Sequence, residues 1–396
     1  MKRKILGLTY VSANQVLNLV SQNYALGLQS FGWDAVTVDL SSPDGARQLQ
    51  NELQSGAVAF CFALQGVGSR LTMGNDGPSV WTHFKTPFLS LHHDNPCCNI
   101  YNHFGDSPYV ANLYLFGCHH DIQKRFVKSD QLSALLPYEL AGIPYEQDIR
   151  FKDRPIRHLF LKSGKSPAVF AEGINQVKEP LREALWAAIA KAEADENLTI
   201  CDLLTEAFIA SGHDPARYWA EFWGFADLIE NYIRTRRAMR VVEWLKFQEG
   251  AVIIGDGWDF IDKTNTKAIF KPSVSGYEAN RMYNQTQFVF NTSPYGYDLI
   301  HERIPLGLCN RACVVSDTNA WWDTHFADVP SLFRFHWGQD IAAQCAEAIH
   351  DPHAASAADS AIGARRVEEK LYGYNQMVRM PMIAEQVRAF AVGKGQ

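Results

Sequence analysis

Residues 288–317 read FVFNTSPYGYDLIHERIPLGLCNRACVVSD, and this stretch decides the fold. An apolar run at 288–290 leads through small and polar residues into the turn Tyr295-Gly296-Tyr297. A short helical pattern and a second apolar run follow, so the order predicts a strand, a loop, a helix and a strand. In such α/β units ligands bind where strands end and helices begin. The turn and the triplet His301-Glu302-Arg303 are therefore the first candidate site, although a solvated helix face also explains three charged or polar residues in a row.

Short apolar runs alternate with helical patterns on both sides of this stretch. Such alternation predicts parallel sheets covered by helices on both faces. The expected strands before residue 150 are 5–10, 35–40, 57–64, 87–91 and 112–116. Those expected after it are 158–161, 251–254, 268–270, 288–290 and 312–315.

The length of 396 residues predicts two domains, or three. The charged stretch 150–155 marks the expected boundary, which gives the domains 1–150 and 151–374. A long helical insertion, 172–248, interrupts the second domain, and the helical spacing of its aromatic residues favours core packing over a ligand box. The stretch after residue 361 is helical, and Pro381 should kink or split it.

Composition excludes several classes of function. A net charge of −6 and a pI of about 6.1 argue against nucleic acid or an anionic membrane as the main partner. The sequence holds eight cysteines and no CxxC motif, so reduced thiols and a cytoplasmic location are expected. The run from Ile5 fits a first buried strand better than a cleaved leader. No apolar run reaches 18 residues, so no transmembrane segment is expected.

Two His-His-Asp triplets, at 92–94 and 119–121, each follow an expected strand of the first domain. Strand ends are where active sites form, so the first triplet suggests a general base. Imidazoles and carboxylates brought together by adjacent strands also suit a metal site. The remaining interpretation is packing and capping, with Asp121 as the N-cap of a helix over 122–127.

Two further segments are rich in basic residues, and the first of them suits a phosphate. The loop Lys162-Ser163-Gly164-Lys165-Ser166 has small residues and two lysines, although a solvated loop explains it equally well. The basic run 234–240 is best explained as a surface cluster that pairs with acidic neighbours.

The order of several short motifs resembles the C-terminal domain of spore-maturation (CgeB-like) glycosyltransferases. The motifs, which span roughly residues 250–350, are Gly255-Asp256-Gly257-Trp258, Tyr277-Glu278 through Tyr283, Phe290-Asn291-Thr292-Ser293-Pro294, His301-Glu302-Arg303 and Val314-Val315-Ser316-Asp317. The resemblance implies the GT-B architecture, which is two Rossmann-like domains, here with the helical insertion and a C-terminal helical tail that crosses back to domain one. The first domain would then comprise 1–150 plus 375–396. The tail would dock there through an apolar surface made of Tyr372, Tyr374, Met377, Met380 and Met382. Where family members commonly have an acidic residue and a glycine, this sequence has Leu306 and Arg311.

The resemblance also implies roles for individual residues. The turn at 295–297 would offer amides to a diphosphate, His301 or Arg303 would supply charge, and Glu302 would accept the ribose hydroxyls unless it only pairs with Arg303 or Lys271. The residues assigned to the nucleotide-sugar site are Lys165, Gly255, Trp258, Lys271, Tyr277, Tyr295, Gly296, Tyr297, His301, Glu302 and Arg303. Asp94 is the expected base, with His92 as its partner, because strand alternation places both on one side.

The expected activity is metal-independent transfer from a nucleotide-sugar donor to a glycan, protein or small-molecule acceptor, in the cleft between the domains. No cofactor is expected, and no Asp-x-Asp motif is present to hold a divalent metal on the diphosphate. Two alternatives stay open. One is a non-catalytic binding scaffold of the same fold, which Leu306 and Arg311 favour, and the other is a metal-dependent hydrolase built on the two triplets.

Overall fold

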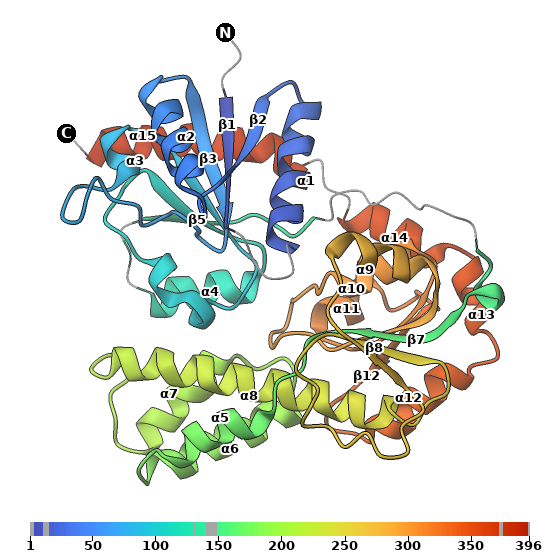
Figure 1. Cartoon of the computed structure of the whole chain (residues 1–396). Helices are drawn as coiled ribbons and strands as arrows, with labels where there is room; N and C mark the ends of the chain where they lie inside the picture. Colours follow the sequence, from blue (N-terminus) through green and yellow to red (C-terminus); the bar gives the residue numbers. More distant parts are fainter. Residues whose placement is uncertain are drawn as a thin grey trace. The chain divides into compact units, whose positions relative to one another are not determined.

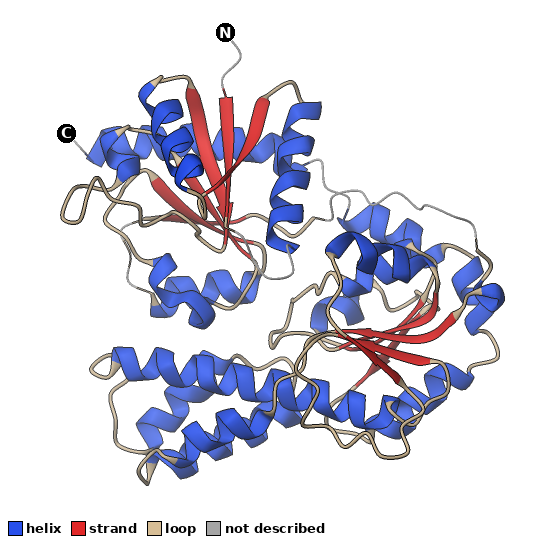
Figure 2. Cartoon of the chain, in the orientation of Figure 1, coloured by secondary structure: helices blue, strands red, loops and turns tan. Residues whose placement is uncertain are grey.

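The computed structural model describes residues 4–10, 16–127, 129, 131–139, 149–371 and 375–394. The chain forms two compact units (Figure 1). Unit 1 comprises Met1–Gly142 and Tyr372–Gln396, and unit 2 comprises Ile143–Leu371. Each unit is a parallel sheet flanked by helices (Figure 2).

The sheet of unit 1 has six parallel strands in the order β2-β1-β3-β4-β5-β6. Its centre is apolar because helices cover both faces, and all seven residues of β3 are buried. The strands are β1 (Lys4–Thr9), β2 (Asp34–Asp39), β3 (Val58–Leu64), β4 (Phe88–His92), β5 (Val110–Tyr114) and β6 (Leu132–Leu135). The helices before unit 2 are α1 (Val16–Ser30), α2 (Pro43–Gln54), α3 (Val80–His83), the 3-10 helix η1 (Pro96–His103) and α4 (Gly117–Phe126).

The last helix, α15 (Asn375–Lys394), belongs to unit 1 and packs beside its sheet (Figure 1). The Tyr24 hydroxyl on α1 donates to Gln376, and Arg388 donates to the carbonyl of Ala59 on β3. The tail therefore crosses back to the first domain, as the GT-B architecture implies. Pro381 lies inside α15 without splitting it, so a split is wrong and only the alternative of a kink stays a prediction.

The apolar face that docks α15 differs from the expected one. Met377 and Met380 are buried, whereas Met382 is exposed. Tyr372 and Tyr374, which we also expected to dock the tail, lie outside the described residues.

The sheet of unit 2 has six parallel strands in the order β12-β11-β10-β7-β8-β9. In register, Leu159 pairs with Val289 and Val289 pairs with Val314, so the buried faces of β7, β10 and β11 form one apolar layer. The strands are β7 (Ile156–Leu161), β8 (Ala251–Ile254), β9 (Ile269–Lys271), β10 (Thr286–Asn291), β11 (Cys313–Asp317) and β12 (Leu332–Phe335).

Four helices between β7 and β8 form the helical insertion, and Figure 1 shows them grouped together beside the sheet of unit 2. They are α5 (Pro167–Asn175), α6 (Leu181–Ala194), α7 (Ile200–Ala210) and α8 (Trp219–Leu245). The other helices of unit 2 are η2 (Phe151–Asp153), α9 (Gly276–Asn284), α10 (Arg303–Cys309), α11 (Ala320–His325), α12 (Ile341–His350), α13 (Ala354–Asp359) and α14 (Ile362–Leu371).

Two helix boundaries differ from expectation. Helix α4 begins at Gly117, so Asp121 lies inside the helix and is not its N-cap. Helix α10 begins at Arg303 with Glu302 as its N-cap, so His301 precedes the helix instead of lying on it.

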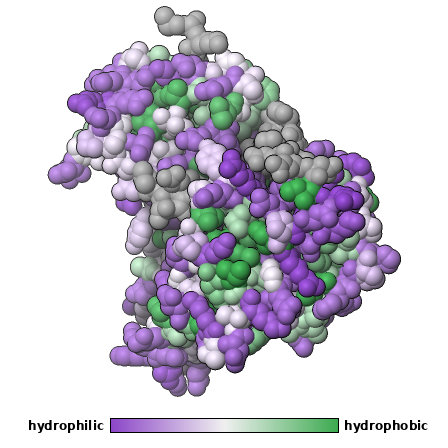
Figure 3. All heavy atoms as spheres, turned by 45° about the vertical axis from the view of Figure 1, so that its right-hand side comes forward, coloured by the Kyte–Doolittle hydropathy of each residue, from purple (hydrophilic) through white to green (hydrophobic). Residues whose placement is uncertain are grey.

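The surface is mixed in character. On the face drawn in Figure 3, hydrophilic residues predominate and apolar residues lie in smaller groups between them. In the part of the chain that the structure describes, no helix is both long enough and apolar enough to cross a bilayer.

Candidate functional site

The candidate site lies at the carboxyl ends of β7 and β10, which are neighbours in the sheet of unit 2. From β7 the chain builds β8 and β9 on one side and then returns to build β10, β11 and β12 on the other. This reversal is the switch point at which open α/β sheets bind ligands. Lys162, directly after β7, bridges the two strands because its Nζ donates to Thr292 Oγ1 at 2.9 Å.

The triplet 301–303 reaches the same strand ends as a linked chain. The Arg303 guanidinium donates from Nη1 to Asn291 Oδ1 at 3.0 Å, and the same Nη1 lies 2.9 Å from His301 Nε2. His301 Nδ1 lies 2.9 Å from Glu302 Oε2. His301 is buried, so the solvated-face explanation does not hold for it, and Glu302 pairs with His301 and not with Lys271. The Glu302 side chain is 51% exposed, which leaves its carboxylate open to a ligand.

The partners of His301 fix its tautomer. Arginine only donates, so Nε2 accepts. A carboxylate only accepts, so the 2.9 Å contact with Glu302 places the proton on Nδ1 and outweighs the longer 3.5 Å approach of the Arg303 N–H to the same nitrogen. His301 is therefore neutral, in agreement with the burial and the adjacent Arg303 charge that lower its pKa to about 4. Partial burial raises the pKa of the half-exposed Glu302, but contact with His301 and the charge of Arg303 outweigh it and bring that pKa well below its usual range.

Three cations converge on this point. Burial, followed by the charges of Arg234 and Arg303, lowers the pKa of Lys162 well below its usual value. Asp317 and Glu302 oppose this shift without cancelling it. The excess of positive charge disfavours protonated Lys162 and would favour an anionic ligand, whose arrival would restore the lysine charge.

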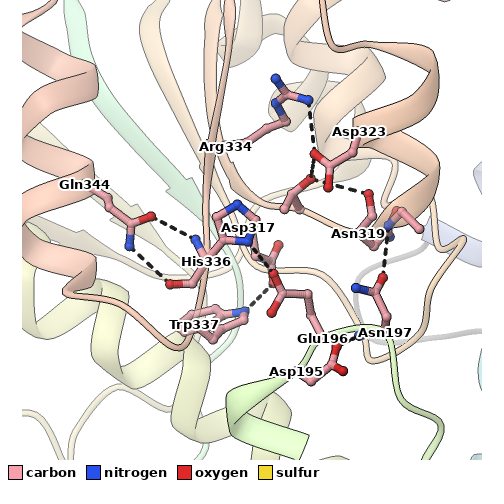
Figure 4. Close-up of polar contacts among 12 residues, drawn as sticks. Asp195, Glu196, Asn197, Asp317, Asn319, Asp323, Arg334, His336, Trp337 and Gln344 are labelled. Carbon is pink, nitrogen blue, oxygen red and sulfur yellow. Dashed lines mark hydrogen bonds and ion pairs between the residues drawn. The ribbon is translucent and has the colours of Figure 1, made fainter.

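A buried polar network holds Arg303 from behind. Asn291, which accepts from Arg303, donates to Ser316 Oγ at 2.9 Å on the neighbouring strand. The backbone N–H of Ser293 donates to Asp317 Oδ1 at 2.8 Å. Trp337 Nε1 donates to Asp317 Oδ2 at 3.0 Å (Figure 4). Because each of these groups is buried and paired, the ends of β10 and β11 are rigidly positioned.

The helical insertion is fastened to these strand ends by the loop between α6 and α7 (Figure 4). Glu196 Oε1 lies 2.7 Å from His336 Nδ1 beyond β12, and Asn197 Oδ1 accepts from the N–H of Ala320 at 3.0 Å. The Tyr295 hydroxyl donates to the carbonyl of Asp195 at 2.6 Å. The insertion thus covers the carboxyl ends of β10, β11 and β12.

Helix α8 also lines the site, which the sequence did not indicate. Glu230 Oε1 accepts from the N–H of Tyr295 at 3.3 Å, and the Arg237 guanidinium lies 5.1 Å from the Tyr295 ring and 5.0 Å from the Trp337 ring. Arg234 lies one helical turn beyond Glu230, and its charge acts on Lys162. The basic run was predicted to be a surface cluster, but Arg237 is buried, so that prediction is wrong for this residue.

Gly255 and Trp258 support the loop after β7. Trp258 is buried and donates from Nε1 to the carbonyl of Lys162 at 2.8 Å. At Gly255, where φ is 144°, an added Cβ would lie 2.3 Å from the same carbonyl oxygen. These two residues therefore position Lys162 through its backbone.

The remaining predicted residues of unit 2 are spread along the strand ends. Lys165 is exposed and lies 4.5 Å from the Phe170 ring, and Lys271 is exposed at the end of β9, two strands from β7. Tyr277 is 64% exposed in the first turn of α9. Gly296 is buried, and Tyr297 is half-buried beside α11, where its carbonyl accepts from the N–H of Trp321.

Tyr295 is buried, and its amide is committed to Glu230. The expectation that the turn 295–297 offers amides to a diphosphate therefore stays a prediction for Gly296 and Tyr297.

The two departures from the family pattern lie on and after α10. Arg311 has φ of 53°, the left-handed conformation that favours the glycine common at this position in the family. Leu306 lies within α10 and offers no second carboxylate.

In unit 1 the expected pairing of Asp94 with His92 is absent. His92 is fully buried, with Nε2 2.8 Å from Ser90 Oγ and 3.0 Å from Asn112 Oδ1. Burial lowers its pKa to about 4. Asp94 is half-buried and accepts instead from Gln65 Nε2 at 2.8 Å. The strand ends at His92, so the alternation that predicted the pairing does not extend to Asp94.

The two triplets do not assemble a metal site in the described residues. No three of their side chains bring ligand atoms within 4.8 Å of one another. His119 is buried inside α4, and Asp121 on the same helix lies 3.7 Å from Lys124. The hydrolase alternative therefore has no support from their geometry.

Comparison with known proteins identifies the architecture. No protein-family model and no curated protein matches the sequence. Among solved structures, the chain is similar to sucrose-phosphate synthase from Thermosynechococcus elongatus, with 10% identity, a TM-score of 0.51 and coverage of 98% of this chain and 100% of that one. It is similar to T4 phage BGT in complex with UDP-glucose, with 8% identity, a TM-score of 0.52 and coverage of 98% and 99%. The DNA-modifying enzyme β-glucosyltransferase gives 9% identity, a TM-score of 0.51 and the same coverage. The chain has the fold of the GT-B glycosyltransferases.

Proposed function

We propose that the chain is a glycosyltransferase that takes a sugar from a nucleotide-sugar donor held by unit 2. The observation that carries the proposal is the group of Lys162, Arg303 and Glu302 at the ends of β7 and β10. A nucleotide sugar has a doubly charged diphosphate and a ribose diol, so it needs cations beside an open hydrogen-bond acceptor. This group offers both within one contiguous set of contacts.

The residues would act on different parts of the donor. Lys162 and Arg303, with Arg234 behind them, would hold the diphosphate and stabilise the negative charge that develops as the sugar leaves. Glu302, ionised and held by His301, would accept both ribose hydroxyls. These fixed cations can neutralise the leaving group themselves, so we propose that transfer needs no divalent metal.

The acceptor would be activated by a group in unit 1. We propose Asp94 as the general base, a role worth roughly 10²–10⁴-fold in rate. The motif order at 255–317 supports membership of the spore-maturation (CgeB-like) family. A scaffold without turnover is the second candidate, favoured by the missing carboxylate at Leu306. Slow release of free sugar from the donor, measured by chromatography, would distinguish an enzyme from a scaffold.

Glu302 provides the test of the donor site. A thermal-shift screen of ADP, CDP, GDP, TDP and UDP first identifies the nucleotide. A ligand at about 100 times its Kd adds roughly 2.7 kcal/mol to the free energy of unfolding. Calorimetry then compares this nucleoside diphosphate with its 2′-deoxy form on the wild type and on Glu302→Ala. The wild type should bind the ribose form more tightly, and Glu302→Ala should lose about 1.5–3 kcal/mol together with most of that preference.

Glu249→Gln is the matched control. Glu249 pairs with Lys267 at 3.3 Å near the amino end of β8, at the opposite edge of the same sheet. This variant should bind as the wild type does. Wild-type affinity together with an unchanged preference for the ribose form in Glu302→Ala would remove the ribose role. Failure of every nucleotide to bind would remove the proposed function.

A further inference from the structure

A second polar group, at the carboxyl ends of β3 and β4 in unit 1, is not used by the donor site. Gln65 follows β3 directly and is nearly buried, with φ of 54° in the left-handed region that a residue with a side chain seldom adopts. Its N–H donates to the carbonyl of Leu91 at 2.7 Å, so the conformation is fixed by the adjacent strand. Backbone strain of this kind costs about 1–3 kcal/mol and commonly marks a functional position.

The strained backbone aims the Gln65 amide at Asp94. Gln65 Nε2 donates to Asp94 Oδ2 at 2.8 Å, and this is the only partner of Asp94 within the residues that the structure describes. Oδ1 of the half-buried carboxylate therefore stays available to a ligand. A carboxylate held through one oxygen and open at the other suits a group that must accept a proton in a defined direction.

The 3-10 helix η1 completes the group. Asn102 Nδ2 donates to the carbonyl of Gln65 at 2.8 Å, and the neighbouring Tyr101 is 61% exposed. The Arg70 guanidinium, on the same loop as Gln65, lies 5.8 Å from the Tyr101 ring centroid. The loop after β3 and η1 are thus joined at two points, with an exposed aromatic ring beside amide and carboxylate groups.

We propose that Gln65, Asp94, Tyr101 and Asn102 form the acceptor subsite and that the acceptor is a saccharide. This inference rests on the proposed transferase function. A sugar hydroxyl both donates and accepts, so it can satisfy the carboxylate and the amides together, and the C–H face of a sugar ring suits the exposed face of a tyrosine. A lipid tail would leave these polar groups unpaired, and an anionic acceptor would be repelled by Asp94.

The proposed step balances in atoms and electrons. The acceptor hydroxyl oxygen forms a bond to the anomeric carbon of the donor sugar while its proton passes to the Asp94 carboxylate. The bond from the anomeric carbon to the diphosphate oxygen breaks, and its electron pair leaves with the nucleoside diphosphate. Gln65 acts as a positioning residue, since it holds Asp94 without touching the reacting atoms.

Ligand-observed NMR on the full chain, with the methyl β-glycosides of glucose, galactose and N-acetylglucosamine as probes, tests the subsite. At least one glycoside should bind. Tyr101→Ala should weaken the affinity for this glycoside about tenfold or more, which corresponds to a loss of roughly 1.4 kcal/mol. Tyr101 is exposed, so this variant should fold. Phe31→Ala is the matched control, because Phe31 is an exposed aromatic residue at the opposite end of the unit 1 strands.

The outcomes separate the two proposals. Each sample is also titrated with the nucleoside diphosphate. If the nucleotide does not bind, the result counts against the transferase function and not against the saccharide subsite. The saccharide subsite is overturned if the nucleotide binds but no glycoside does, or if Tyr101→Ala binds the glycoside as tightly as the wild type. It is also overturned if sugar is transferred to a Ser/Thr peptide while every glycoside is inert as an acceptor.

Gln65 supplies the second readout. Gln65→Glu places a second carboxylate against Asp94, and two carboxylates in contact cannot both stay ionised. In Gln65→Glu, the acid side of the pH–rate profile for sugar transfer should therefore move to higher pH. Gln65→Leu should lower the rate of transfer without this shift. An unaltered pH profile in Gln65→Glu would show that Asp94 is not the base that Gln65 positions.

Discussion

His92 makes unit 1 sensitive to acid. Its imidazole is fully buried between β4 and β5, and the His103 ring stacks on it at 4.0 Å between centroids. Burial lowers its pKa from 6.5 to about 4, and the nearby His93 adds to this. Between these values the unfolded chain binds a proton that the folded chain does not. The free energy of unfolding therefore rises with pH across this window and falls as pH drops through it.

The size of the effect follows from the two pKa values. Relative to pH 8, one such imidazole lowers the free energy of unfolding by about 2 kcal/mol at pH 5. The loss approaches roughly 3 kcal/mol below pH 4. His92→Gln keeps a polar atom near the Nε2 position, which contacts Ser90 and Asn112, but it cannot be protonated. We expect the variant to lose the contribution of His92, whereas the contribution of buried His103, whose pKa burial also lowers, remains.

Hydrogen exchange of peptides from β4 and β5, followed by mass spectrometry and corrected for the intrinsic exchange rate, measures unit 1 separately from unit 2. Wild-type protection should fall between pH 8 and pH 5 by about 2 kcal/mol more than in His92→Gln. Peptides of β7, which contains His158 with a pKa also lowered by burial to about 4, should show the same fall in both proteins. Equal pH dependence of β4 and β5 in wild type and His92→Gln would refute the reasoning.

Three further perturbations test other parts of the structure. Arg311→Gly should raise the free energy of unfolding by about 1 kcal/mol, because φ is 53° at this position. Asn265→Gly, at a φ of 57°, should raise it less, because asparagine tolerates the left-handed region. Equal effects of the two variants in urea titrations would contradict the argument. Sugar transfer should survive EDTA, because side-chain cations are proposed to neutralise the leaving group, and full loss restored by manganese or magnesium would overturn this. Removal of the residues after Gly373 deletes α15, whose Met380 and Val387 are fully buried, so the truncated protein should be insoluble; a soluble and fully active product would show that the tail is dispensable.

The sequence predicted the fold well because parallel strands are buried on both faces and read as short apolar runs. It missed β6 and β12, each of four residues at an edge of its sheet. Edge strands carry mixed polar and apolar residues, so their pattern resembles that of a loop. The triplet 301–303 was found because its charges interrupt an apolar stretch.

Residues whose roles depend on tertiary contacts were harder to assign. Two lysines follow β7, and only the structure shows that Lys162, and not Lys165, bridges to Thr292. The basic run on α8 has the composition of an ordinary surface segment. It lies near the strand ends only because α8 packs there in the folded chain, although the two are far apart in sequence. The pairing of His92 with Asp94 failed because strand alternation predicts the side of a sheet, not the partner of a residue beyond the strand end.

Lys162 tests the donor site most directly. Calorimetric titration compares a nucleoside diphosphate with its parent nucleoside on the wild type, Lys162→Met and Lys267→Met, the last being an exposed lysine paired with Glu249 near the amino end of β8. The wild type and Lys267→Met should both prefer the diphosphate. Lys162→Met should lose about 1.5–3 kcal/mol of diphosphate affinity, roughly tenfold or more, while nucleoside binding holds. An unchanged preference for the diphosphate in Lys162→Met would contradict a nucleotide-sugar site at the ends of β7 and β10.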